Sequence, residues 1–198
     1  MIDISNISDD APYSEFKKKY KNAIKNNQKN VEAICLSSYS STREEVNSRF
    51  VNIKQIIDKE FIFYSNYSSP KASEFEENKK VSAVFFWNSI NIQIRIKATI
   101  KKKSKLFNQS YFESRSINKN ALAISSCQSQ VTSSYESIIK NYEEALASKD
   151  LKTCPEYWGG YSIIPYSFEF WEGHEYRLNK RNLYENKNKN WSKKILEP

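Results

Sequence analysis

The chain has 198 residues and a formal net charge of +8, with 39% hydrophobic, 27% charged and 14% aromatic residues. This mixture is typical of a folded globular protein, and the length indicates a single domain over 1–198. No apolar run approaches the roughly 20 residues that a membrane helix needs, and the first residues lack the pattern of a signal peptide. We therefore expect a cytoplasmic protein without a membrane partner.

Cysteine, histidine and charge exclude several function classes. The three cysteines, Cys35, Cys127 and Cys154, are far apart and lack zinc-site spacing, which indicates free thiols in a reducing compartment. With His174 as the single histidine, we expect neither a metal site nor a histidine-based triad. The pI of about 9.2 is consistent with a lysine-rich surface or with affinity for anions. Because the lysines are scattered and no nucleic-acid-binding motif occurs, we expect no nucleic-acid partner.

Hydrophobic periodicity predicts a mainly β protein with peripheral helices. In chain order, the predicted elements are a helix at 13–27, strands at 31–38, 46–57 and 60–65, a helix at 70–78, strands at 80–87 and 90–100, helices near 104–114 and 132–148, and aromatic strands between 161 and 195. From Ile90 to Ile100 every second residue is apolar, so one face of that strand should seal a core. Ser133 and Glu136 predict a capping box for the 132–148 helix. A small antiparallel barrel with flanking helices fits this order best.

Two stretches in the first half of the chain contain residues that could bind a ligand. Arg49 and Lys54 place two cations on a β-prone segment, although two surface bases on an edge strand would look the same. The stretch 63–72 runs from a strand through hydroxyl-bearing residues to Lys71 at a helix start. Backbone N–H groups and Lys71 there would suit a phosphate monoester, but a capped helix with a solvated lysine is equally consistent.

Two further stretches lie in the second half. Tyr111 and Arg115 are four residues apart, so they share a helix face and could grip one ligand, or simply pack together. The segments 157–161 and 168–181 combine aromatic residues, adjacent glycines and two arginines four residues apart. If 175–181 is extended, Arg177, Asn179 and Arg181 share one face. Only three glycines occur, so each should mark a backbone position that needs one.

The order of these motifs resembles the pyridoxine 5′-phosphate oxidase family from about Pro12 to Pro198. The motifs are RxVxxK, FYSNxxSxKA, a strand with Gln, YFxSR, WGG, FWxGxxxRLxxR and a closing WxxxxLxP. The resemblance implies an FMN-binding split β-barrel, antiparallel and Greek-key-like, that works as a homodimer through C-terminal strands at about 161–198. It also implies FMN-dependent oxidation of pyridoxamine or pyridoxine 5′-phosphate to pyridoxal 5′-phosphate, with O2 as electron acceptor and H2O2 as product.

The same resemblance assigns roles residue by residue. Positions that match cofactor contacts are Arg49, Phe50, Val51, Asn52, Ile53, Lys54, Tyr64, Ser65, Lys71, Gln93, Gln128, Ser129, Trp171 and Arg181. Positions that match substrate contacts are Lys54, Tyr111, Arg115, Lys119, Arg177 and Asn179. Of these, Arg177 and Asn179 match catalytic positions, and Gln128 with Ser129 would reach the cofactor across the dimer interface.

The chain departs from the family pattern in four places. Pro70 stands where the family usually has Arg, Lys119 where Ser is usual, and Asn179 where His is usual; the stretch 43–48 lacks the usual Gly and Pro. These changes affect the substrate site more than the fold. They leave open a related FMN split-barrel oxidoreductase with another substrate, or a flavin-binding protein without oxidase activity.

Overall fold

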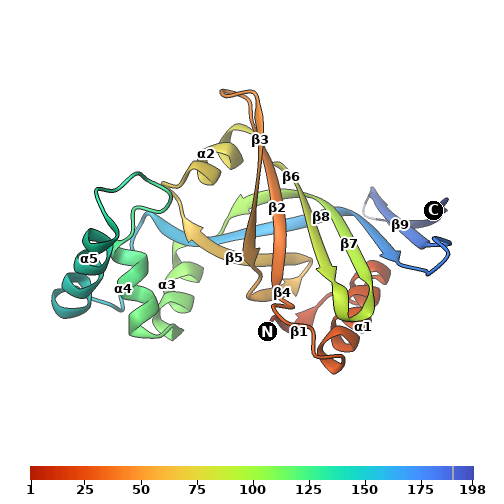
Figure 1. The fold of residues 1–198 in the computed structure, drawn as a ribbon, viewed down its shortest axis with the longest axis horizontal. Helices are drawn as coiled ribbons and strands as arrows, with labels where there is room; N and C mark the ends of the chain where they lie inside the picture. The colour runs from red at the N-terminus through yellow and green to blue at the C-terminus, as the bar shows by residue number, and fades with distance from the viewer. Residues whose placement is uncertain (189) are drawn as a thin grey trace.

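The computed structural model describes residues 1–188 and 190–198, which form one large sheet with helices around it (Figure 1). The elements are β1 (Asp3–Ile7), α1 (Ala11–Lys25), β2 (Ala33–Ser40), β3 (Glu45–Asn52), β4 (Gln55–Asp58), β5 (Glu60–Asn66), α2 (Pro70–Glu77), β6 (Lys80–Trp87), η1 (Asn88–Ile90), β7 (Ile92–Lys102), α3 (Lys105–Ser114), α4 (Ile117–Ser125), α5 (Tyr135–Ser148), β8 (Trp158–Glu172), β9 (Lys180–Lys187) and β10 (Asn190–Leu196). The prediction of a mainly β fold with peripheral helices is confirmed.

Strand β8 organises the sheet. The order of paired strands is β1-β4-β5-β8-β7-β6-β2-β3, with β9 paired to β8 and β10 to β9. The first half of β8 pairs with β5, its last six residues pair with β9, and β7 lies along its other edge. All pairs are antiparallel except β1 with β4, so the described sheet is mixed, and its strand order does not close on itself.

The isoleucine-rich strand β7 has the predicted two-faced character. Ile92, Ile94 and Ile96 are buried, while the residues between them face outward or are half-buried. The strand begins two residues later than predicted, because Ile90 belongs to the short helix η1. Burial of alternate side chains follows from the period-2 geometry of a strand.

Helix α1 covers one face of the sheet with aromatic side chains. Phe16 is completely buried and meets the ring of Phe61 edge to face, with 5.1 Å between ring centroids. Tyr13, also buried, meets Phe168 in the same manner at 5.2 Å. Aromatic rings prefer such edge-to-face contacts, and they tie the N-terminal helix to strands from both halves of the chain.

Several predicted boundaries were wrong for identifiable reasons. The expected strand 46–57 is two strands, because the backbone leaves β2 after Asn52 and Lys54 N–H donates to Ile62 of β5. The N-cap of α5 is Ser134, whose hydroxyl accepts from Ser137 N–H, rather than Ser133. Strand β1 and helix α4 were not predicted. In α4 only two of nine residues are buried, so its apolar pattern is weak.

The glycines are required by close approach rather than by backbone angles. None of the three glycines has a positive φ. A Cβ on Gly159 would lie 2.2 Å from the Asn108 amide and 2.3 Å from the Tyr67 hydroxyl. A Cβ on Gly173 would lie 2.1 Å from the amide nitrogen of Asn91. Larger side chains would therefore displace neighbouring groups at both positions.

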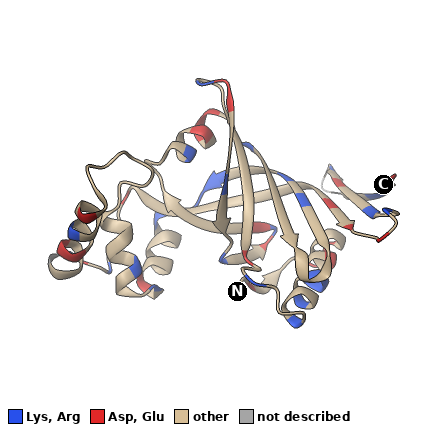
Figure 2. Cartoon of the chain, viewed as in Figure 1, with Lys and Arg blue, Asp and Glu red and all other residues tan. Residues whose placement is uncertain are grey.

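Charge is distributed over the whole molecule. Lys and Arg occur on helices and strands in all parts of the molecule, interspersed with Asp and Glu (Figure 2). Among the described residues, no helix is long and apolar enough to cross a membrane.

Candidate functional site

A cavity of about 510 Å³ opens between the sheet and the helices at one end of the molecule. We call it the pocket. Its lining residues are Phe50, Val51, Asn52, Lys54, Tyr64, Ser65, Lys71, Tyr111, Ser114, Arg115, Ser116, Lys119, Gln128 and Trp158. Strands β3 and β5, the start of α2 and the segment from α3 to α4 supply most of them. Most of the predicted site residues from the first two thirds of the chain therefore converge here.

Stacked aromatic rings form one wall of the pocket. The ring of Tyr64 stacks on that of Tyr111, with 3.7 Å between centroids and 5° between planes. The Tyr64 ring also stacks on the ring of Trp158, with 5.2 Å between centroids and 11° between planes. Trp158 belongs to the WGG motif but was not predicted as a site residue.

Arg115 lies against this wall with an unused hydrogen-bond donor. Its guanidinium carbon is 4.3 Å from the centroid of the Trp158 ring, and Nη2 donates to the Lys119 carbonyl at 3.1 Å. Nη1 is buried and has no hydrogen-bond partner among the described residues. Burial also lowers the pKa of Arg115, against an opposing effect of Tyr111. A buried, unpaired guanidinium N–H is costly, so this geometry favours an anionic ligand.

Lys71 provides a second cation in the same pocket. Its amine donates to the hydroxyls of Ser65 at 3.2 Å and Ser69 at 3.1 Å, and the residue is 8% exposed. Burial and, to a lesser extent, the charge of Arg49 lower the pKa of Lys71 to about 8, against an opposing effect of Glu74. A desolvated amine surrounded by hydroxyl groups is suited to a phosphate group.

The start of α2 offers fewer backbone donors than expected. Pro70 has no N–H, Ser69 N–H donates to Asn66 O, and Ala72 N–H donates to Ser69 O. Recognition of an anion at this helix end therefore depends mainly on side chains.

Gln128 lies in the pocket of its own chain. Its side-chain oxygen accepts from the Ser65 hydroxyl at 2.9 Å and from Asn66 N–H at 3.1 Å. Ser129 follows in an exposed turn with a left-handed backbone, φ 65°. The resemblance had implied a contact across a dimer interface for this pair.

Two residues of the RxVxxK motif, Arg49 and Ile53, are not among the residues that line the pocket. The side chain of Ile53 is completely buried in the hydrophobic core. Arg49 lies behind the pocket, where its guanidinium donates to Glu74 at 2.7 Å and to the Ser38 hydroxyl at 2.6 Å. Strand alternation places Phe50 and Asn52 on the exposed face of β3 and Arg49 and Val51 on its half-buried face.

A second group of predicted residues lies at the far end of β8. Gln93 on β7, Trp171 on β8 and Arg181 on β9 are direct cross-strand partners in one row. Arg181 donates through Nε and Nη2 to Glu169, at 3.0 and 2.8 Å. From Trp158 at the pocket to Trp171 in this row, β8 extends roughly 40 Å at its usual rise per residue, and Figure 1 shows the strand crossing the molecule.

Arg177 and Asn179 lie in the turn between β8 and β9, so the predicted extended face over 175–181 is wrong. Arg177 has a left-handed backbone, φ 63°, and its N–H donates to the His174 carbonyl. The Asn179 side chain accepts from His174 N–H at 3.0 Å. The two residues are held near Arg181 by this turn rather than by strand alternation.

Comparison with known proteins identifies the family. The family model described as the pyridoxine 5′-phosphate oxidase C-terminal dimerisation region matches residues 158–198. A pyridoxine/pyridoxamine 5′-phosphate oxidase of Psychromonas ingrahamii is 38% identical over 154 residues, covering 76% of this chain and 70% of the relative. A Hydrogenovibrio crunogenus protein named pyridoxine/pyridoxamine 5′-phosphate oxidase 1 is 33% identical over 191 residues, covering 94% of this chain and 88% of the relative. The chain belongs to the pyridoxine 5′-phosphate oxidase family. The names of these relatives indicate an oxidase.

Solved structures agree with this membership. PhzG from Burkholderia lata 383, crystallised with tetrahydrophenazine-1-carboxylic acid, has a TM-score of 0.89 and 25% identity, covering 96% of this chain and 95% of that one. A Nostoc punctiforme protein described as pyridoxamine 5′-phosphate oxidase-related and FMN-binding has a TM-score of 0.79 at 10% identity, with 95% and 98% coverage. The second likeness shows the fold alone. Together they confirm the fold predicted from the sequence.

Proposed function

We propose that this protein is an FMN-dependent oxidase that makes pyridoxal 5′-phosphate. With pyridoxamine 5′-phosphate the reaction consumes O2 and water and releases ammonia and H2O2; with pyridoxine 5′-phosphate it consumes O2 and releases H2O2. The observation that carries the proposal is the buried, unpaired Nη1 of Arg115 beside the aromatic wall. A planar ring that bears a phosphate matches that combination of surfaces.

The donor set of the pocket fits FMN. Lys71 and the Ser65 hydroxyl would hold the cofactor phosphate, with Arg49 behind them. Asn52, Lys54 and Gln128 would contact the rest of the cofactor from the pocket lining. When bound, FMN supplies the redox chemistry, and the protein orients the substrate carbon against it.

On the substrate side, Tyr111, Arg115 and Lys119 would bind the phosphate and stack against the pyridine ring. A guanidinium suits this task because its planar N–H groups match two phosphate oxygens. Lys54 would lie between the two ligands and contact both.

A homodimer completes the site in this proposal. Gln93, Trp171 and Arg181 lie roughly 40 Å from the pocket along β8, too far to serve the same bound cofactor within one chain. A partner subunit would bring its own row, with Arg177 and Asn179 beside it, to the pocket of the first. The family match to a dimerisation region at 158–198 supports this arrangement. The free cysteines support placing the protein in the reducing cytoplasm.

A second candidate is a related flavin oxidoreductase that acts on another ring substrate. PhzG, which is similar over nearly the whole chain, was crystallised with a ligand that carries a carboxylate. Arg115 would bind a carboxylate as readily as a phosphate. The departures at Lys119 and Asn179 also lie in the substrate half of the site.

One experiment separates these functions. The purified protein is titrated with FMN, followed by its absorbance spectrum, and then mixed with pyridoxamine 5′-phosphate in air. Formation of pyridoxal 5′-phosphate together with H2O2 supports the proposal. Flavin binding without any product over many hours excludes it in favour of the second candidate, and failure to bind FMN at high micromolar concentration excludes both.

A further inference from the structure

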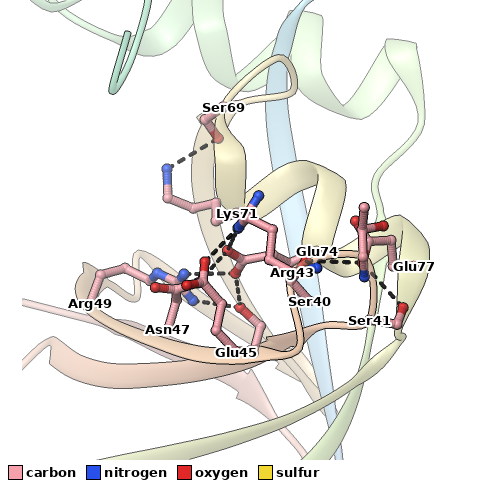
Figure 3. Close-up of polar contacts among 12 residues, drawn as sticks. Ser40, Ser41, Arg43, Glu45, Asn47, Arg49, Ser69, Lys71, Glu74 and Glu77 are labelled. Atoms are coloured by element: carbon pink, nitrogen blue, oxygen red, sulfur yellow. Dashed lines mark hydrogen bonds and ion pairs between the residues drawn. The ribbon is translucent and has the colours of Figure 1, made fainter. Parts of the chain in front are cut away.

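The carboxylate of Glu74 is buried and fully engaged behind the pocket (Figure 3). The residue lies on α2 and is 1% exposed. Its Oε2 accepts from the Ser38 hydroxyl and, at 2.7 Å, from Arg49 Nη2. Its Oε1 accepts from Arg43 Nη2 at 2.8 Å and from the Asn47 amide at 3.0 Å. A buried charge with this many donors is held in one position.

Glu74 determines where the Arg49 guanidinium lies. Arg49 also donates through Nη1 to the Ser38 hydroxyl and the Leu36 carbonyl, at 2.6 and 3.4 Å. These bonds and the bond to Glu74 use three of the five N–H groups of a guanidinium. The two remaining N–H groups have no hydrogen-bond partner among the described residues, and the Arg49 side chain is 20% exposed. Glu74 sets the orientation in which a ligand would meet them.

The same carboxylate lies close to the pocket amine. Lys71 is on the same helix, three residues before Glu74, and its amine turns toward Ser69 (Figure 3). The charges of Arg49 and Glu74 both act on Lys71, in opposite directions. Two neighbouring cations repel each other, so a fixed counter-charge is needed to hold both at one place.

We propose that Glu74 is a positioning residue for the cofactor phosphate: it fixes Arg49 beside Lys71 so that both cations meet the same phosphate group. This inference depends on the FMN binding proposed above. Glu74 itself carries the same sign of charge as the phosphate. Any benefit it brings to phosphate binding must therefore act through Arg49 and Lys71.

Because Glu74 and the phosphate carry charge of the same sign, the effect of removing Glu74 can distinguish a positioning role from a purely structural role. With Arg49 present, removing the Glu74 charge frees the guanidinium and weakens phosphate recognition. With Arg49 absent, its charge no longer lowers the pKa of Lys71, so this amine is charged at neutral pH with or without Glu74, and the remaining effect of the carboxylate is to repel the phosphate. Its removal should then leave recognition unchanged or improve it.

Arg43 provides a matched control. It donates to the same carboxylate from the β2–β3 hairpin, but its side chain is 45% exposed and also pairs with Glu45. Arg43→Ala removes one ion pair from Glu74 without altering the contacts of Arg49. It should leave phosphate recognition at the wild-type level.

The test is the ratio of riboflavin to FMN dissociation constants, followed by flavin fluorescence, because riboflavin lacks only the phosphate. Glu74→Gln should lower this ratio about tenfold or more, the loss of one charge-assisted contact, while the riboflavin constant stays within about twofold. Glu74→Asp keeps the charge on a shorter side chain, so its ratio should lie between those of Glu74→Gln and the wild type. This variant replaces Glu74→Gln in the test if the latter does not fold. In the Arg49→Ala background, Glu74→Gln should not lower the ratio further.

Three results would overturn the inference: an unchanged ratio in Glu74→Gln, an equal fall for both flavins, or additive losses in the double variant. Failure of the wild-type protein to bind FMN is a different outcome, since it refutes the proposed function itself.

Discussion

Raising the pH from 7 to 9 should weaken FMN binding, because Lys71 loses its charge over this interval. In the folded protein the pKa of Lys71 is lowered to about 8, first by burial and then by the charge of Arg49. At that pKa roughly nine tenths of the amines are charged at pH 7 and roughly one tenth at pH 9. A phosphate that binds only the charged form would lose about tenfold in affinity over this interval. An unperturbed lysine would produce almost no change, because its pKa is about 10.4.

The sign for stability is opposite to that for binding. Between about pH 8 and the ordinary lysine pKa, the unfolded chain holds the proton that folded Lys71 has released, so this group makes the flavin-free protein more stable as pH rises. Bound phosphate favours the charged amine and removes this effect. The stabilisation that FMN confers should therefore shrink between pH 7 and 9.

The assay is the riboflavin-to-FMN ratio of dissociation constants measured from pH 7 to 9, since the flavin ring is common to both. Lys71→Arg keeps the charge without titrating in this range and should give a flat profile. Glu74→Gln should move the midpoint to lower pH, because Glu74 raises the pKa of Lys71. A wild-type ratio that does not change with pH would refute the assignment of Lys71 to the phosphate.

The remaining predictions concern other parts of the molecule. Pro70→Arg should tighten FMN binding by about 10–100-fold, the range of one added charge-assisted contact, in a flavin titration. Arg181→Ala should release flavin, whereas Arg177→Ala should raise the KM for the phosphorylated substrate and leave the flavin spectrum nearly unchanged; equal flavin loss in both would contradict this division. Asn179→His should speed turnover and introduce a limb near pH 6–7 in the rate profile that the wild type lacks. Phe16→Ala should lower the free energy of unfolding by about 3–5 kcal/mol, measured with denaturant, because the ring is completely buried.

The sequence by itself determined most of the local elements and the family. The alternation along β7 is visible in the residues because a strand has a period of two, and it was confirmed from Ile92 onward. Pro70 at a helix start and the aromatic spacing of α1 are likewise local signals. The spacing of the motifs was sufficient to identify the family, because each motif lies within one short segment.

Only the tertiary structure decided which of these residues meet. Strand pairing is non-local, so nothing within 46–57 shows that the chain changes partner after Asn52. The length of β8 separates the pocket from the Trp171 row, although both motifs appeared to belong to one site. Glu74 lies in no motif, and its role arises because folding brings the β2–β3 hairpin over α2 and buries a charge that must be paired.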